Sequence, residues 1–169
     1  KVQKIYLRLT PGVDAHTHEF ISTAHEDVKF GFSIASGAAQ DAIENCMAQS
    51  SLSLAGIHCH IGSQIFEVDG FNLAAKRLVA VLATFRDKYA KELPELNIGG
   101  GYGIAYTKEE TAIAPEIVIP AIAAVIKEEC AKAKLAIPRI SIEPGRAIVG
   151  PTTTTIYLVG TTKSVTLDN

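Results

Sequence analysis

The sequence lacks the features that mark several large classes of protein. Its 16 basic and 18 acidic residues nearly balance, so it has no basic surface of the kind that binds nucleic acid. It contains no apolar run near the roughly 20 residues that span a bilayer, no recognisable signal peptide and no low-complexity tract. We therefore expect a soluble globular protein that binds neither nucleic acid nor a membrane.

Cysteine is scarce, and its spacing carries no metal signature. Cys46, Cys59 and Cys130 lie far apart, with no CxxC pair or other zinc-binding spacing. An odd, scattered set of cysteines is typical of reduced thiols in the cytoplasm. We expect a cytoplasmic protein with no bound metal.

The length is sufficient for a sizeable core but not for every fold. The chain has 169 residues, of which 47% are hydrophobic; a complete (β/α)₈ barrel has roughly 250 residues. It opens in a strand-like run at residues 4–9 and stops in polar residues after another such run. No linker divides it, so we expect one domain or a piece of one, and we interpret the chain as a fragment.

Helical and strand-like segments alternate along the chain. Apolar residues recur at helical spacing over residues 39–47 and 71–85, and a third helix is predicted to start near Pro120, which is tolerated in a first turn. Strand-like apolar runs occupy residues 4–9, 30–34, 54–58, 95–98, 139–142 and 155–159. This alternation predicts an α/β fold of five or six near-parallel strands with helices outside, forming an incomplete barrel.

Three of the strand-like runs lead into polar or glycine-rich segments. These segments are residues 59–64, 99–103 and 143–146. In a (β/α) barrel the active site is built at the C-terminal ends of the strands. We therefore expect an enzyme in which His60, Gly101 and Glu143 converge at one end of the sheet.

The glycine run Gly99, Gly100 and Gly101 favours an anion site. Successive glycine amides can form a concave nest for phosphate, and the hydroxyl of Ser63 could donate to the same anion. The run does not match the dinucleotide fingerprint, because Ile104 stands where the third glycine would fall, and no Walker lysine follows. The alternative is a tight turn between a strand and a helix.

Glu143 needs a cationic partner, because a carboxylate at the end of an apolar strand is costly to bury alone. The partner could be Arg146, in a clasp that holds the turn, or a protonated heterocycle nitrogen. His60 is placed to present its ring at a strand end, although a lone histidine is often structural. His58 and His60 would share a strand face and could bind a metal, but no further ligand stands at a recognised spacing.

Together these segments resemble the fold-type III pyridoxal-phosphate decarboxylases, whose TIM-like barrel is of the alanine racemase type. The resemblance covers nearly the whole chain. Residues 29–31 (Lys-Phe-Gly), the glycine triplet and residues 143–146 (Glu-Pro-Gly-Arg) are shared broadly in that group. The histidine-rich segment at residues 16–19, followed by residues 29–31, is more particular to its diaminopimelate decarboxylase branch.

The resemblance implies a cofactor, a reaction and roles for named residues. The cofactor would be pyridoxal 5'-phosphate, and the reaction would convert the amino acid meso-diaminopimelate to L-lysine and CO₂, the last step of lysine biosynthesis. The implied catalytic residues are Glu143, which pairs with the ring nitrogen, and His60, which packs against the ring. Arg146 would also reach a substrate carboxylate, which suits a guanidinium fork. The implied phosphate-binding set is Gly99, Gly100, Gly101, Ser63 and the turn of Glu143, Pro144, Gly145 and Arg146.

The resemblance also assigns the chain a place in a larger enzyme. Residues 1–169 would be the central part of the cofactor-binding barrel. The first strands, with the Schiff-base lysine, and the C-terminal β-domain would lie outside the chain. Lys29 matches only the later Lys-Phe-Gly segment. The chain alone is therefore expected to be inactive, and the full-length enzyme to be a homodimer.

Three alternatives stay open. A sister decarboxylase acting on arginine, ornithine or carboxynorspermidine would use the same cofactor-binding residues. A metal-dependent amidohydrolase is suggested by residues 13–18, which resemble the His-x-His segment of that class, but it leaves the glycine triplet and residues 143–146 without a role. A catalytically silent domain that binds a partner would fit if the chain were complete.

Overall fold

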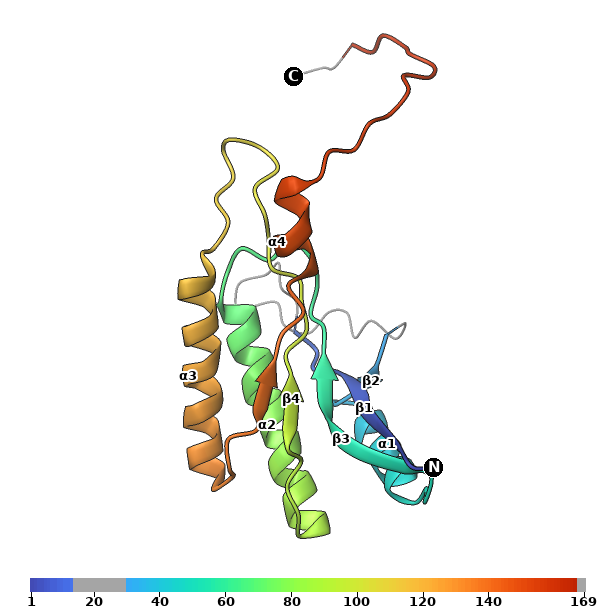
Figure 1. The fold of residues 1–169 in the computed structure, drawn as a ribbon, viewed down its shortest axis with the longest axis vertical. Coiled ribbons are helices and arrows are strands. Elements are labelled where there is room, and N and C mark those ends of the chain that lie inside the picture. The colour runs from blue at the N-terminus through green and yellow to red at the C-terminus, as the bar shows by residue number, and fades with distance from the viewer. Residues whose placement is uncertain (14–29, 167–169) are drawn as a thin grey trace.

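The computed structural model describes residues 1–13 and 30–166, and its centre is a parallel β-sheet (Figure 1). Five strands lie in the order β2-β1-β3-β4-β5, and every neighbouring pair is parallel. The strands are β1 (Gln3–Thr10), β2 (Phe32–Ser33), β3 (Leu52–Cys59), β4 (Glu95–Asn97) and β5 (Arg139–Ser141). The predicted α/β class with near-parallel strands is confirmed.

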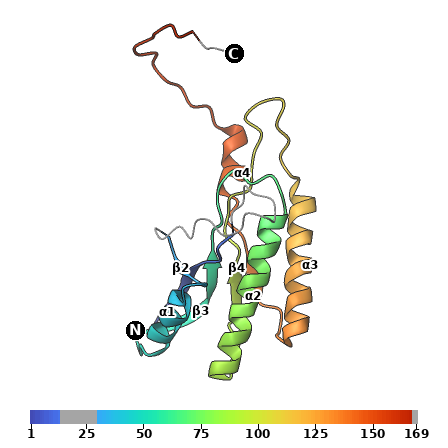
Figure 2. The same cartoon turned by 180° about the vertical axis from the view of Figure 1, so that it is seen from behind.

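Among the described residues, three helices connect strands and cover one face of the sheet, and a short fourth follows the last strand and lies beyond the end of the sheet (Figure 1). They are α1 (Ala38–Met47), α2 (Asp69–Tyr89), α3 (Pro115–Ala133) and the short α4 (Gly145–Val149), followed by a 3₁₀ turn, η2 (Gly150–Thr152). Figures 1 and 2 show α2 and α3 side by side along the sheet. Ile57, Leu96 and Ile98 are fully buried on the covered face. None of these helices combines the length and apolar composition of a membrane span, within the described ranges.

The third helix begins earlier than the sequence predicted. Pro115 occupies its first turn, and Pro120 lies inside the helix. Pro120 has no N–H to donate to the carbonyl of the residue four positions before it, so the second turn lacks one hydrogen bond. Four buried side chains at helical spacing hold the helix in place nonetheless: Val118, Ile122, Ile126 and Cys130. Tertiary burial therefore outweighs the local cost of the proline.

The strand predicted at residues 155–159 does not form. This segment leaves the sheet as an extended chain with no regular structure (Figure 1), and its apolar side chains are exposed, 87% for Ile156 and 99% for Leu158. β-branched and aromatic composition indicates a tendency to pair, not the presence of a partner. Within the described residues no strand lies beside this segment, so its backbone has no sheet neighbour.

A β-bulge in β3 decides which of its side chains face the helices. The register with β1 shifts between Ile5 and Tyr6, which leaves Ala55 as an extra residue on β3. Beyond the bulge, Ile57 is fully buried toward the helices. His58 consequently points to the opposite face, where the polar strand ends lie.

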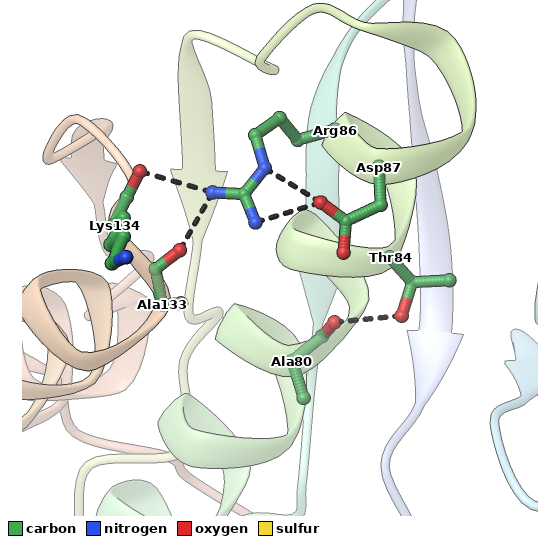
Figure 3. Close-up of polar contacts among 6 residues, drawn as sticks. All are labelled: Ala80, Thr84, Arg86, Asp87, Ala133 and Lys134. Carbon is green, nitrogen blue, oxygen red and sulfur yellow. Dashed lines mark hydrogen bonds and ion pairs between the residues drawn. The ribbon is translucent and has the colours of Figure 1, made fainter.

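Arg86 of α2 closes the C-terminal end of α3 (Figure 3). Its Nη1 atom donates to the carbonyl oxygens of Ala133 at 2.6 Å and Lys134 at 3.0 Å. The carboxylate of Asp87 orients the guanidinium, at 2.9 Å from Nε and 2.8 Å from Nη2. The last carbonyls of a helix lack partners within the helix, so Arg86 both satisfies them and fixes α3 against α2.

Candidate active site

The three polar strand ends meet at one end of the sheet. The N–H of Glu143 donates to the carbonyl of Gly99 at 2.8 Å, which joins the end of β5 to the glycine turn after β4. A Cβ atom at Gly99 would lie 3.2 Å from the Cα of His60, so the end of β3 also lies against the glycine turn. Gly101 accepts a hydrogen bond from the N–H of Ile65 at 2.9 Å. The predicted convergence of His60, Gly101 and Glu143 is confirmed.

Close packing of these strand ends requires the glycine triplet. An added Cβ atom would lie 2.0 to 2.3 Å from a neighbouring carbonyl oxygen at each position: that of Cys59 for Gly99, Glu143 for Gly100 and Gly62 for Gly101. The glycines thus allow close backbone approach, but they do not form a tight turn between a strand and a helix, because the next helix, α3, begins only at Pro115. Close approach and anion binding do not exclude each other. The N–H of Gly99 donates to Oδ1 of Asn97 at 2.8 Å. The N–H groups of Gly100 and Gly101 have no partner among the described residues, so they are the amides that could hold an anion.

Arg146 lies against this turn with its charge unneutralised. Its Nη2 atom donates to Oγ of Ser63 at 3.1 Å, and its Nη1 atom donates to the hydroxyl of Tyr106. No carboxylate pairs with it in the described part of the chain, so the clasp between Glu143 and Arg146 is not present. Two neutral hydroxyls orient the guanidinium without cancelling its positive charge. Sequence reasoning missed Tyr106, since no motif spacing marks it.

Glu143 projects from the end of β5, and neighbouring strands supply its contacts. Nδ2 of Asn97 donates to Oε1 of Glu143 at 2.8 Å, and Nε2 of His58 lies 3.5 Å from the same oxygen. The side chain of Glu143 is 55% exposed, so it is less desolvated than its place after an apolar strand suggested. Asn97 was also missed. Its position two residues before Gly99, on the same strand face, was the available signal.

Both histidines of the β3 end are held in the neutral form. Burial lowers the pKa of His60, and the cation of Arg8 lowers it further against the opposing pull of Glu143. The pKa of His58 is lowered by burial in the same way. Although neighbouring groups shield the ring of His60 enough to lower its pKa, the residue is exposed by accessible surface, so a ligand can reach it. Residues 1–13 and 30–166 contain no group of three side chains that could bind a metal, and His16 and His18 lie outside the described residues.

The Glu-Pro-Gly-Arg turn offers fewer amides than its sequence suggests. Pro144 has no N–H, and the N–H of Gly145 donates to the carbonyl of Glu143 at 2.9 Å. The backbone N–H of Arg146 is left for an anion. Pro144 and Gly145 thus shape the turn, while Lys29, the remaining motif residue, lies outside the described residues.

The chain is similar to known proteins in sequence and in fold. The family described as pyridoxal-dependent decarboxylase, pyridoxal binding domain, matches residues 1–150. The chain is 47% identical over its whole length to a diaminopimelate decarboxylase from Corynebacterium efficiens, and 44% identical over 95% of its length to one from Bacillus subtilis. It covers 37% of each of these relatives.

A solved structure with a similar fold is that of diaminopimelate decarboxylase from M. jannaschii in complex with L-lysine. It matches with a TM-score of 0.76 and 29% identity over 88% of this chain and 33% of that one. The chain thus spans little more than a third of its relatives, and its parallel sheet forms part of the barrel domain found in such structures. Its residues 1–150 place it in the family of pyridoxal-dependent decarboxylases, within their pyridoxal-binding domain.

Proposed function

We propose that this chain is the central part of the cofactor-binding barrel of a diaminopimelate decarboxylase, which converts meso-diaminopimelate to L-lysine and CO₂. The observation that carries the proposal is the convergence of three different donors and acceptors at one end of the sheet: the glycine turn, the pair of Ser63 and Arg146, and the carboxylate of Glu143. The relatives named diaminopimelate decarboxylase support this substrate over the others in the family.

The side chains and amides present fit pyridoxal 5'-phosphate. The free amides of Gly100 and Gly101, the hydroxyl of Ser63 and the cation of Arg146 suit a phosphate dianion. His60 offers a neutral, exposed ring on which a planar heterocycle can stack. When bound, the cofactor supplies the electron sink for the carbanion that decarboxylation leaves.

Glu143 is the residue that tunes this chemistry. A carboxylate beside the ring nitrogen favours its protonated form, as an opposite charge does for any titrating group. Asn97 and His58 both approach Oε1, which leaves Oε2 for the ring nitrogen. The neutral state of His60 also matters, since a second positive charge against a protonated ring would oppose this pairing.

Arg146 binds an anion through a planar fork that its neighbours orient. Ser63 and Tyr106 accept hydrogen bonds from its two terminal nitrogens and fix the plane of the guanidinium. We assign it to the cofactor phosphate and to a carboxylate of the substrate, because a fixed fork recognises either group by paired hydrogen bonds.

A substrate survey on the full-length protein tests the proposal. The protein, loaded with pyridoxal 5'-phosphate, is given meso-diaminopimelate, arginine, ornithine or carboxynorspermidine, and CO₂ release is measured. We expect release from meso-diaminopimelate alone, with L-lysine as the co-product. Release from one of the other three would assign a sister decarboxylase. Bound metal without the visible absorbance of the cofactor would favour the amidohydrolase.

We further propose that the full-length enzyme is a cytoplasmic homodimer. Cys46, Cys59 and Cys130 are free and buried, as is common for proteins of a reducing compartment. The resemblance to the family supports a site completed by a neighbouring subunit. Light scattering of the full-length protein should give twice the subunit mass, and a monomer that is fully active would contradict the dimer.

A further inference from the structure

A row of polar side chains crosses the sheet two residues before the strand ends that form the proposed site. In the strand register, Arg8 of β1 pairs with His58 of β3, His58 pairs with Asn97 of β4, and Asn97 pairs with Ser141 of β5. Residues paired in this way point to the same face of a parallel sheet. Glu143, two residues beyond Ser141, points to that face as well. His58 and Asn97 therefore stand directly beneath the carboxylate of Glu143.

His58 has a buried nitrogen whose nearest acceptor is this carboxylate. Its side chain is only 16% exposed, and Nε2 makes no hydrogen bond within the described residues. Oε1 of Glu143 lies 3.5 Å away, slightly too far for a good hydrogen bond. A buried polar atom without a partner is costly, so a small movement that joined the two would be favourable. The side chain of Glu143 is half exposed and that of His58 is mostly buried, so Glu143 is the residue of the two that can move.

The charges around His58 determine what its nitrogen can do. Burial lowers the pKa of His58, and Arg8 and His60 lower it further, while Glu143 raises it. The lowering effect wins, so the imidazole is neutral near pH 7 and carries one proton. A proton on Nε2 would make His58 a neutral donor to Glu143. A neutral donor orients a carboxylate and stabilises its charge without cancelling it.

We propose that His58 is a positioning residue for Glu143: its Nε2–H donates to Oε1 when the cofactor is bound, which turns Oε2 toward the ring nitrogen. The inference rests on the proposed function. Asn97 already donates to Oε1 at 2.8 Å, so two donors on rigid strands would hold one oxygen. Hydrogen bonds of this kind are often long before the ligand binds and tighten afterward.

The first test compares three variants of the full-length protein. His58→Gln keeps a donor at nearly the same place, since its amide nitrogen is as many bonds from the backbone as Nε2. His58→Met keeps the volume and removes the donor. Ser141→Ala is the matched control, because Ser141 lies in the same row and its side chain has no hydrogen bond to Glu143 in the described structure.

The readout is the ¹⁵N chemical shift of the ring nitrogen of labelled pyridoxal 5'-phosphate, together with kcat. We expect the shift of a protonated nitrogen in the wild type, His58→Gln and Ser141→Ala. In His58→Met it should move toward the unprotonated value, with kcat lower by roughly tenfold, the worth of one lost hydrogen bond. A wild-type shift in His58→Met would overturn the inference, since a residue that only fills space would behave in this way.

A second measurement holds even if His58→Met fails to fold. Long-range ¹H–¹⁵N spectra of the wild-type protein with cofactor report which ring nitrogen of His58 carries the proton. A neutral ring protonated on Nε2 supports the inference, and an unprotonated Nε2 overturns it. If the wild type neither binds the cofactor nor decarboxylates an amino acid, the proposed function itself fails. Normal activity with an unprotonated Nε2 would contradict only the positioning role of His58 and would leave the proposed function intact.

Discussion

Backbone hydrogen bonds on both sides of Glu143 fix the position of its main chain, and so the point from which its carboxylate extends. Its N–H donates to the carbonyl of Gly99 at 2.8 Å, and its own carbonyl accepts from Gly145 at 2.9 Å. The side chain is half exposed and so remains accessible to a ligand. A fixed main chain with an accessible carboxylate suits a residue that stabilises a charge on a bound group.

Glu143→Gln tests this charge with little change of shape. The variant should still bind pyridoxal 5'-phosphate, because the phosphate contacts are elsewhere, but it should lose roughly 100-fold or more in kcat, since an amide cannot stabilise a protonated ring nitrogen. Steady-state decarboxylation by the full-length protein measures this. Glu128→Gln makes the same change on the outer face of α3, where Glu128 pairs with Lys132, and should be silent. Wild-type turnover in Glu143→Gln would refute its role.

Arg146→Lys tests the planar fork while keeping the charge. A single ammonium cannot reproduce the oriented contacts with Ser63 and Tyr106, so kcat/KM should fall by roughly 10- to 100-fold. Cofactor titration and substrate kinetics separate the two anions that Arg146 could hold. Tyr106→Phe should produce a weaker loss of the same kind. If Arg146→Lys has unchanged kinetics, the arginine serves only to hold the turn.

Sequence reasoning placed the main site residues but not their supports. The ends of three strands in a parallel sheet must meet, which was enough to bring His60, the glycine turn and Glu143 together. Tyr106 was missed because its contact depends on the path of a loop, which no motif spacing encodes. Asn97 could have been found, because the two-residue period of a strand places it on the same face as Gly99.

Among the elements, β3 depends most on a small residue. In the sheet register Gly56 lies between Tyr6 of β1 and Glu95 of β4. The hydroxyl of Tyr6 reaches across Gly56 and donates to the carboxylate of Glu95. A Cβ at Gly56 would lie 2.2 Å from the carbonyl oxygen of Glu95, a backbone atom that can yield only if the strand moves. The bulge that aims His58 at the site is at the preceding residue, so the two features are linked.

Gly56→Ala should therefore lower the free energy of unfolding by about 1–3 kcal/mol, the usual cost of overpacking. Urea denaturation of the full-length protein measures the change. Gly160→Ala is the control, because a Cβ there would meet no atom within 4 Å, and it reports the effect of the same change on the unfolded chain alone. Equal stability of the two variants would show that β3 has room for a methyl group at residue 56.

Periodicity placed α1, α2 and the five strands of the sheet close to where the structure has them. The buried stripe of α2 contains every apolar residue predicted for it, from Phe71 to Phe85. By contrast, the start of α3 and the missing strand at residues 155–159 depend on tertiary partners. A strand needs a neighbour for its backbone groups, which explains the missing strand at residues 155–159. The start of α3 was misplaced for another reason: the sequence predicts Pro120 in a first turn, whereas burial of the helix face allows it inside the helix.

On the scale of the whole molecule, the side-chain contacts found at the proposed cofactor site among the described residues involve no lysine. We predict that borohydride reduction of the full-length enzyme with pyridoxal 5'-phosphate labels a lysine outside residues 1–169. Peptide mapping by mass spectrometry locates the label, and residues 1–169 alone should show no specific adduct and no decarboxylase activity. Stoichiometric label on Lys29 would mean that the catalytic lysine has been misplaced.

The crystal structure of the full-length enzyme with pyridoxal 5'-phosphate tests the central claim most directly, namely that the ends of β3, β4 and β5 form the cofactor site. We predict that the phosphate accepts hydrogen bonds from the amides of Gly100 and Gly101, and that the ring nitrogen faces Glu143. A cofactor bound elsewhere, or bound at this end with its ring nitrogen turned away from Glu143, would contradict the account.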